Sequence, residues 1–227
     1  MAMIPKTIHY CWFGGKPLPE KAQRCIASWK KYCPDYRLQR WDETNFDLTQ
    51  NAYVRYCYEN EKWAFLSDYV RLAVVAEHGG IYLDTDVELL CAPDKLLEES
   101  AFYSFETSSC VNTGQGFGAV SHHETVEAML QQYAAIVPPD ISACPHYNTA
   151  ALVALGLIPD GSEQTVAGAK ILPTDYMNPY DDLTGRLNIT ENTVSVHWYA
   201  KSWVKPGLVL RSRLLRPFRR LFGKHPR

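Results

Sequence analysis

The stretch GGIYLDTD at residues 79–86 places two carboxylates directly behind a short apolar segment. The β-prone residues 81–83 predict a short strand, and in α/β proteins ligands bind at the carboxyl ends of the strands. If the chain stays extended through Thr85, the side chains of Asp84 and Asp86 point to the same side. Neighbouring carboxylates repel each other unless a cation lies between them, and such oxygen ligands select Mn²⁺ or Mg²⁺. The sequence therefore predicts a divalent-cation site at Asp84 and Asp86.

Strands and helices are expected to alternate on both sides of this stretch. Residues 7–13 and 36–41 predict strands, a helix that begins at Pro19 lies between them, and residues 51–78 predict two successive helices. Further strands are expected at 87–90, 102–105, 116–120 and 193–198, and further helices at 124–136 and 148–155. This order predicts an α/β fold, as a single domain with a mixed central sheet.

Composition narrows the class of protein. The chain has 227 residues, 46% of them hydrophobic, which suits one domain with a true core. Its 7 cysteines are scattered and form no C-x-x-C pair, which argues against a disulfide framework and a cysteine zinc site. The N-terminus lacks the apolar region of a signal peptide, and no apolar run reaches the length of a membrane span. We therefore expect a cytoplasmic protein.

Charge is divided unevenly along the chain. Glu191 is the last acidic residue, and 9 of the 23 basic residues follow it. The basic stretch is interleaved with leucines and phenylalanines, so we expect a domain of residues 1–203 and a basic amphipathic tail of residues 204–227, bent at Pro217. Such a tail suits an anionic membrane surface, here the inner face of the cytoplasmic membrane. A packed C-terminal helix and a disordered end are the alternatives, and nucleic acid is disfavoured because the acidic body would repel its backbone.

Four segments give the chain a family resemblance: IPKTIHYCWFG at 4–14, AFLSDYVR at 64–71, GGIYLDTD at 79–86 and HWYAKSW at 197–203. Together they resemble glycosyltransferase family 32, the D-x-D sugar transferases of the capsular-polysaccharide and yeast initiating-mannosyltransferase type. The likeness extends more distantly to the glucosylating clostridial toxins. It implies a GT-A fold, the Rossmann-like fold of nucleotide-diphospho-sugar transferases.

The resemblance implies a role for each acidic residue of the motif and for its partners. Asp86 would bind the cation directly, Asp84 would hold the donor ribose or a metal-bound water, and His197 would be a third ligand. Asp68 would bind hydroxyls of the donor sugar, with Arg71 orienting it or reaching the donor. By spacing alone, Asp68 and Arg71 could equally be a surface ion pair, and His197 a core histidine.

Other residues of these segments are expected to contact the donor. Trp12 and Tyr82 would stack on the base or ribose, although both could simply pack in the core. Ser67 belongs to the same motif as Asp68. Ser202 and Trp203 would contact the diphosphate and cover it as a flap that excludes water. The polar stretches at 112–116 and 145–148 could contact donor or acceptor, or be ordinary loops.

These roles describe a retaining, metal-dependent transfer of a hexose or N-acetylhexosamine, from a UDP-sugar in preference to GDP-mannose. The acceptor would be a saccharide or lipid-linked saccharide in capsule or envelope synthesis. No nucleophile follows from the spacing, and Asp68 is the nearest candidate. Paired carboxylates also suit a metal-dependent nucleotidyl- or phosphotransferase, or a glycoside hydrolase. A sugar- or lipid-binding protein with an inactive site is the non-enzymatic alternative.

Overall fold

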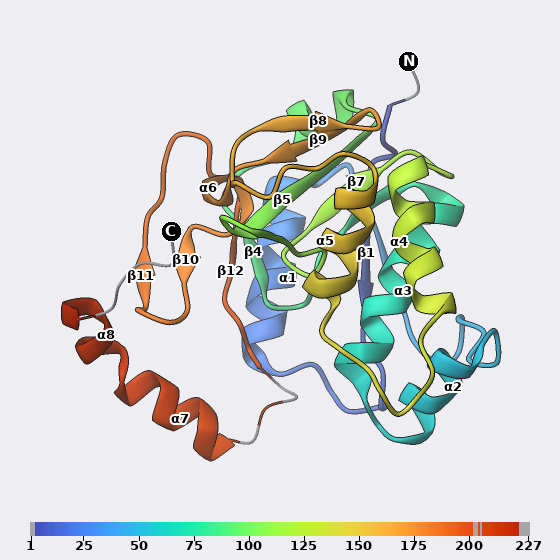
Figure 1. Cartoon of the computed structure of the whole chain (residues 1–227), viewed down its shortest axis with the longest axis horizontal. Helices are drawn as coiled ribbons and strands as arrows, with labels where there is room; N and C mark the ends of the chain where they lie inside the picture. The colour runs from blue at the N-terminus through green and yellow to red at the C-terminus, as the bar shows by residue number, and fades with distance from the viewer. Residues whose placement is uncertain (1–2, 202–203, 205, 223–227) are drawn as a thin grey trace.

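The computed structural model describes residues 3–201, 204 and 206–222 (Figure 1). In chain order its elements are β1 (Thr7–Cys11), α1 (Glu20–Tyr32), β2 (Arg37–Trp41), α2 (Ala52–Glu59), α3 (Trp63–His78), β3 (Gly80–Tyr82), β4 (Val87–Leu89), η1 (Asp94–Glu98), β5 (Ala101–Thr107), β6 (Cys110–Val111), β7 (Phe117–Ala119), α4 (Glu124–Ala134), α5 (Cys144–Ala154), β8 (Gln164–Val166), β9 (Ala169–Leu172), α6 (Thr174–Met177), β10 (Tyr180–Asp181), β11 (Arg186–Leu187), β12 (Ser195–His197), α7 (Pro206–Leu214) and α8 (Arg216–Phe222).

Most of the predicted elements are present, but one helix starts earlier than expected and several short elements were not predicted. Helix α5 begins at Cys144, four residues before the predicted start, because Pro145 fits the first turn of a helix. The hairpins β8–β9 and β10–β11 were not predicted. Their strands are only two to four residues long, too short for the alternation of apolar and polar residues to stand out.

The central sheet is mixed, as predicted. Its strand order is β2-β1-β3-β7-β5-β9-β8, and β6 pairs with β5 beside this path. Strand β1 is parallel to both β2 and β3, and β5 is parallel to β9. Strand β7 runs antiparallel to both β3 and β5. Because β1 and β3 are parallel neighbours, the residues that follow them meet at one edge of the sheet.

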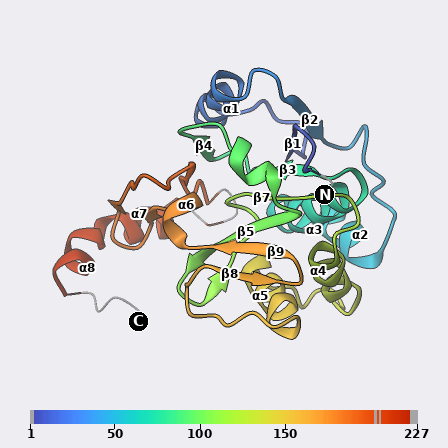
Figure 2. The same cartoon turned by 90° about the horizontal axis from the view of Figure 1, so that it is seen from above.

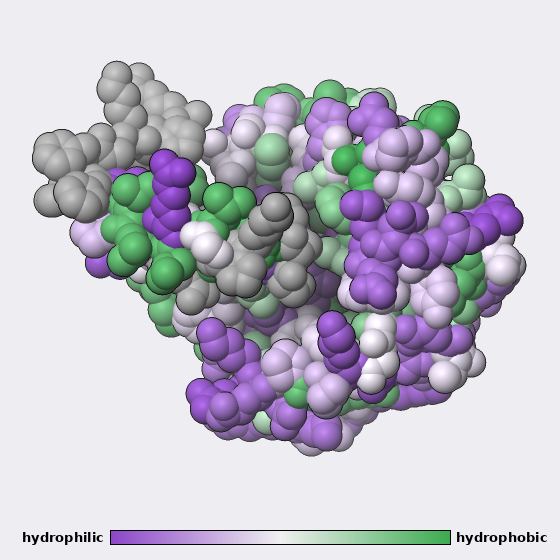
Figure 3. Space-filling model, turned by 90° about the horizontal axis from the view of Figure 1, so that it is seen from below, coloured by the Kyte–Doolittle hydropathy of each residue, from purple (hydrophilic) through white to green (hydrophobic). Residues whose placement is uncertain are grey.

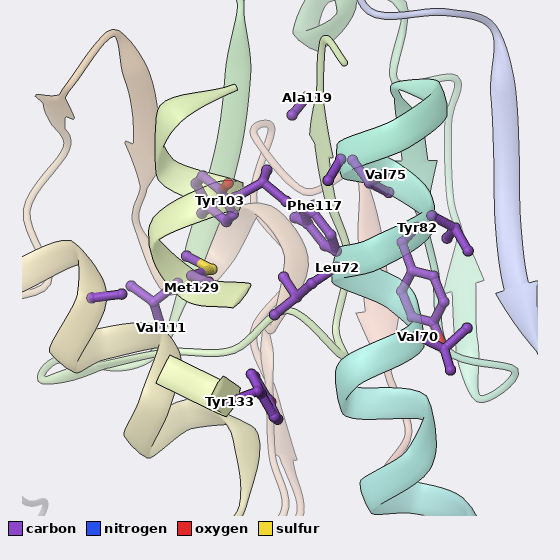
Figure 4. Close-up of a cluster of buried hydrophobic side chains, with 14 of the residues drawn as sticks. Val70, Leu72, Val75, Tyr82, Tyr103, Val111, Phe117, Ala119, Met129 and Tyr133 are labelled. Atoms are coloured by element: carbon purple, nitrogen blue, oxygen red, sulfur yellow. The ribbon is translucent and has the colours of Figure 1, made fainter. Parts of the chain in front are cut away.

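Helices cover both faces of the sheet. Seen from above in Figure 2, α1 lies on one side of the strands, and α3, α4 and α5 lie on the other. Alternation along β3 supplies both layers, since Ile81 packs in the cluster around α1 and Tyr82 in the cluster around α3. Figure 4 shows the second cluster, where Leu72, Met129 and Phe117 come from α3, α4 and β7.

The glycine pair Gly79–Gly80 lets the chain pass from α3 directly into β3 close beside β1. Gly79 caps α3 with a φ of +63°, and Gly80 has a φ of +109° at the start of β3. A Cβ at Gly80 would lie 2.8 Å from the main-chain oxygen of Thr7. Only glycine fits this position without displacing β1.

The C-terminal segment forms two short helices, as the sequence predicted. The break lies at Leu215, and Pro217 occupies the first turn of α8. Helix α8 is held against the β10–β11 hairpin, since Arg216 forms an ion pair with Asp182 (2.9 Å) and Arg220 donates to the main-chain oxygen of Thr184 (2.6 Å). The boundary between a domain of residues 1–203 and a tail of 204–227 stays a prediction.

Helix α7 differs from the expected amphipathic pattern. Leu208, Leu210 and Leu214 are 56%, 60% and 66% exposed. Leu208 and Leu210 are about 200° apart around a helix, so the apolar surface is not confined to one face. Figure 3 shows apolar surface gathered on the C-terminal helices. None of the described helices is long and apolar enough to cross a membrane.

Candidate active site

The D-x-D segment forms a turn between two sheets. After β3 the chain turns, and the Val87 N–H donates to the main-chain oxygen of Asp84 (3.0 Å). The chain therefore does not stay extended through Thr85, so strand alternation does not apply to Asp84 and Asp86. The physical reason is that β4 leaves the central sheet and pairs instead with β12. Asp84 and Asp86 are brought to one side by this turn rather than by strand alternation.

Pairing of β4 with β12 brings a distant histidine to the same place. In the antiparallel register His197 lies opposite Val87, next to Asp86. Its Nε2 is 3.3 Å from Asp86 Oδ1, and the ligand atoms of Asp84, Asp86 and His197 all lie within 4.8 Å of one another. The structure thus brings together the three residues that the resemblance implied as metal ligands.

The residues of this cluster fit a divalent cation. Two carboxylates and an imidazole make a donor set that suits Mn²⁺, and Mg²⁺ through the oxygens. The Nδ1 atom of His197 is buried and has no hydrogen-bond partner among the described residues. Because buried polar atoms are usually paired, this imidazole is incomplete without a further group. The cluster is therefore a candidate metal site.

Charges in the cluster are strongly coupled. Burial raises the pKa of Asp86, but the charge and hydrogen bond of His197 outweigh it and hold the pKa at about 2. Burial lowers the pKa of His197, yet the negative charges of Asp86 and Asp84 raise it above the ordinary value of 6.5. In the metal-free protein the two carboxylates therefore favour the charged form of the imidazole, and a bound cation would take the place of its proton.

Arg71 joins the cluster to helix α3. Its guanidinium Nη2 lies 2.9 Å from Asp68 Oδ1 and 3.1 Å from Asp84 Oδ1, and the residue is only 3% exposed. Burial raises the pKa of Asp68 to about 6, although the charge of Arg71 opposes the shift. The alternative of a surface ion pair is therefore wrong, because Arg71 is a buried bridge between two carboxylates. Direct contact of Asp68 or Arg71 with a donor stays a prediction.

Two predicted donor contacts have other partners in this structure. Tyr82 is 1% exposed, and its hydroxyl donates to Asp84 Oδ1 (2.8 Å), so it orients that carboxylate instead of stacking on a base. Its ring faces α3 because side chains alternate along β3. The hydroxyl of Ser67 donates to the main-chain oxygen of Trp63 (2.9 Å) within its own helix. Ser202 and Trp203 lie outside the described residues.

Trp12 lies at the expected edge of the sheet. It directly follows β1, which is parallel to β3 and pairs with it through His9 and Tyr82. The indole is half-buried, and its Nε1 donates to the main-chain oxygen of Lys16 (2.6 Å). Stacking on a base stays a prediction.

Sequence reasoning missed a further acidic residue near the cluster, Glu106. Glu106 lies near the end of β5, and its Oε1 accepts hydrogen bonds from Asn112 Nδ2 (3.0 Å) and from the hydroxyl of Tyr199 (3.1 Å). The ring of Tyr199 packs 4.1 Å from that of His197, centroid to centroid. A signal was available, because Glu106 follows the apolar run at 101–105 as Asp84 follows residues 81–83.

Asn112 and Gly114, from the polar stretch at 112–116, complete this wall of the site. The Gly114 N–H donates to Asn112 Oδ1 (2.7 Å). A Cβ at Gly114 would lie 2.5 Å from Asp84 Oδ2 and 2.7 Å from Arg71 Nη1. The loop can pack against the carboxylate only because residue 114 is glycine. The stretch is thus part of the site rather than an ordinary loop.

Comparisons with known proteins match the part of the chain that contains the D-x-D segment. Residues 19–103 match the family model described as the glycosyltransferase sugar-binding region containing the DXD motif. Inositol phosphoceramide mannosyltransferase 3 of Schizosaccharomyces pombe is 31% identical over 125 residues, which are 51% of this chain and 34% of that protein. Subversion of eukaryotic traffic protein A of Legionella pneumophila is 25% identical over 131 residues, 44% of this chain and 20% of that protein.

A solved structure supports the fold. PaToxG glycosyltransferase has a TM-score of 0.51 and 20% sequence identity, and the match covers 67% of this chain and 69% of that one. The chain spans about a third and a fifth of the lengths of the two curated relatives. The matched region and the curated relatives make this chain similar to the DXD-containing glycosyltransferases of the family 32 type. The solved structure supports the GT-A fold.

Proposed function

We propose that this protein transfers a sugar from a nucleoside-diphosphate donor, with Mn²⁺ or Mg²⁺ held by Asp84, Asp86 and His197. The observation that carries the proposal is the convergence of these three residues within 4.8 Å. They lie at the carboxyl end of β3, the side of a sheet where α/β proteins bind ligands. A bound cation would neutralise the diphosphate as the bond between the anomeric carbon and phosphate breaks.

The chain's own residues then supply order and charge. Arg71 contacts Asp68 and Asp84 through one guanidinium nitrogen, and the Tyr82 hydroxyl donates to the same oxygen of Asp84. The Ala200 N–H donates to Asp86 Oδ2 (2.6 Å), which ties the C-terminal segment to the metal ligand. Carboxylates held in this way need little reorganisation when a donor binds.

The finer chemistry is also part of the proposal. We favour a UDP-hexose or UDP-N-acetylhexosamine, retention of the anomeric configuration, and a saccharide or lipid-linked saccharide of capsule or envelope as acceptor. The name of the fission yeast relative adds mannose to the sugars that need testing, so GDP-mannose belongs in the donor panel. Nuclear magnetic resonance of the first-formed product would show whether configuration is retained.

A binding screen followed by turnover tests the proposal. Thermal unfolding would be followed with Mn²⁺ and each of UDP-glucose, UDP-galactose, UDP-N-acetylglucosamine and GDP-mannose, because a ligand that binds only the folded state raises its stability. We expect at least one donor to raise the melting temperature in Mn²⁺ but not in EDTA. Absence of any metal-dependent shift, together with absence of nucleoside-diphosphate release, would contradict the proposal.

The same assay separates the rival reactions. A nucleotidyltransferase would release pyrophosphate from a nucleoside triphosphate, and a phosphotransferase would transfer its terminal phosphate. A glycoside hydrolase would cleave glycosides without nucleotide and regardless of chelator. The closeness of Asp84 and Asp86 favours a shared cation over two carboxylates that flank a sugar.

We further propose that α7 and α8 bring the protein to an anionic membrane surface. Leu208, Leu210, Leu214 and Leu215 give these helices exposed apolar surface, and the segment carries no acidic residue. Arg216 and Arg220 are engaged with the β10–β11 hairpin, so they position the helices against the body. Apolar insertion would thus contribute more than these two charges.

Flotation with lipid vesicles tests this second proposal. We expect the protein to float with vesicles that contain phosphatidylglycerol, and less with vesicles of phosphatidylcholine alone. Replacement of Leu208, Leu210 and Leu214 by serine should abolish flotation. The matched control replaces three exposed apolar residues of the body, Val137, Val153 and Ile158, by serine. Equal flotation of both triple variants would contradict the proposal.

A further inference from the structure

The Glu106 carboxylate is held by hydrogen bonds to one of its two oxygens, Oε1. Residues 101–105 of β5 are buried, and Glu106 is the first half-buried residue after them. Both of its side-chain hydrogen bonds, from Asn112 and Tyr199, end on Oε1. Among the described residues none donates to Oε2. No lysine, arginine or histidine of the described chain forms an ion pair with Glu106.

Two separate routes of contact lead from Glu106 to the candidate metal site. Through Asn112 it is joined to the Gly114 N–H, and Gly114 packs directly on Asp84. Through Tyr199 it is joined to the ring that packs on His197. Tyr199 has a φ of +49°, a region that residues with a side chain rarely adopt. Both routes join Glu106 to the wall of the site formed by Asp84 and His197.

The carboxylate of Glu106 offers two acceptor oxygens, and only Oε1 is used by the described residues. A purely structural partner for Asn112 and Tyr199 would need only a neutral acceptor such as glutamine. The second carboxylate oxygen, which a glutamine would lack, indicates that Glu106 accepts a hydrogen bond from a ligand. In a sugar-binding site most of the hydrogen-bond donors on the ligand are hydroxyl groups.

We propose that Glu106 Oε2 accepts a hydrogen bond from a hydroxyl group of a sugar substrate and thereby contributes to sugar specificity. The inference rests on the proposed function, because it names a contact within that site. The hydroxyl can belong to the transferred sugar of the donor or to the acceptor saccharide. The two sources predict different kinetic results.

Glu106→Gln is the sharpest test. The side chain keeps its size, and its carbonyl oxygen can still accept from Asn112 and Tyr199, while the charge and the second acceptor are lost. Transfer to methyl glycosides of common hexoses should fall about 10- to 100-fold, the range for a lost hydrogen bond to a charged group. Affinity for the nucleoside diphosphate alone in Mn²⁺ should stay within about twofold, since that molecule carries no transferred sugar.

Binding and hydrolysis of the nucleotide sugar in the absence of an acceptor show which substrate carries the hydroxyl. If the hydroxyl belongs to the donor, Glu106→Gln weakens binding of the nucleotide sugar and slows its hydrolysis by water. If it belongs to the acceptor, donor binding and hydrolysis stay the same, and the KM for the methyl glycoside rises. Either result supports the proposal and assigns the source.

Controls separate this contact from support of the fold. Tyr199→Phe removes one hydrogen bond to Oε1 but keeps the ring on His197, so we expect a loss below about fivefold. If Glu106→Gln does not fold, Glu106→Asp is the second variant, because it withdraws the carboxylate by one methylene. It should show the loss in the same measurement, either donor binding and hydrolysis or the KM for the methyl glycoside.

The proposal would be overturned if Glu106→Gln transferred at the wild-type rate with every donor, or if its whole loss followed from weaker binding of the nucleoside diphosphate. Failure of the proposed function looks different, because the wild-type protein would then bind no nucleoside diphosphate in Mn²⁺.

Discussion

Two buried histidines, His9 and His197, have opposite electrostatic surroundings. They are 2% and 6% exposed. Trp41 Nε1 donates to His9 Nδ1 (3.1 Å), so Nε2 carries the proton and donates to the main-chain oxygen of Gly79 (2.9 Å). Burial lowers the pKa of His9 to about 4. For His197 the neighbouring carboxylates outweigh burial and raise the pKa.

The difference separates a structural histidine from a candidate ligand. His9 uses both ring nitrogens within the fold and has no carboxylate beside it. His197 faces Asp86 with one nitrogen, and its other nitrogen has no partner in the described part of the chain. Burial alone therefore does not identify a functional histidine. The carboxylates around the ring and the unpaired nitrogen do.

The largest expected effect is on the rate of sugar transfer when Asp86, the carboxylate beside His197, is removed. Asp86→Ala should lower the rate of transfer at least about 1,000-fold. The reason is that the cation proposed to neutralise the diphosphate is held by this carboxylate. Nucleoside-diphosphate release in saturating Mn²⁺ measures the effect. The control is Glu88→Gln, two residues further along the chain, where we expect less than a threefold change. Wild-type turnover in Asp86→Ala would contradict the assignment.

The next largest expected effect is on stability, when the buried Arg71 guanidinium between Asp68 and Asp84 is removed. Arg71→Met leaves Asp68 and Asp84 without their counter-charge, and the free energy of unfolding at pH 8 should fall by about 3 kcal/mol. Urea unfolding measures this change. Arg55→Met, at an exposed position of α2, should cost less than about 0.5 kcal/mol. Equal stability of the two variants would mean that Arg71 does not hold these carboxylates.

Exchange of each histidine for glutamine compares the two rings directly. His197→Gln should weaken Mn²⁺ binding by at least about tenfold, since even outer partners of metal ligands change affinity 10- to 100-fold. His9→Gln should leave Mn²⁺ affinity unchanged. Isothermal titration with Mn²⁺ at pH 8, where the His197 proton competes less, measures both. Equal affinities in the two variants would exclude His197 as a ligand.

A further expected effect is the pH dependence of stability contributed by His9. Its folded pKa of about 4 lies below the ordinary value of 6.5, so the unfolded state binds a proton first as the pH falls. This stabilising contribution is complete above pH 6.5 and is lost as the pH falls towards 4. The expected loss is about 2 kcal/mol between pH 7 and pH 5. Urea unfolding at both values should show a steeper decline in wild type than in His9→Gln, and parallel declines would contradict this.

Local pattern was sufficient for much of the fold and the centre of the site. Apolar runs and glycines located the strands and helices, and the acidic pair after β3 marked the edge of the sheet. His197 could be linked to that pair only through the family resemblance, because the β4–β12 pairing spans more than a hundred residues. The spacing of residues along the sequence does not show which residues of β4 and β12 lie opposite each other.

The errors have physical reasons that spacing also hides. The turn at 84–86 follows from the change of sheet at β4, and the burial of Tyr82 follows from which face of β3 meets α3. Glu106 was missed because its partners Asn112 and Tyr199 reach it through loops that return from different directions. Such convergence belongs to tertiary structure.

The most direct test of the central claim is a crystal grown with Mn²⁺ and whichever of UDP and GDP binds more tightly, measured near the manganese absorption edge. We predict one anomalous peak between the nucleotide diphosphate and the D-x-D turn, about 2 Å from a carboxylate oxygen of Asp86 and close to the His197 imidazole. Bound nucleotide with manganese elsewhere, or with these side chains turned away from it, would contradict the account.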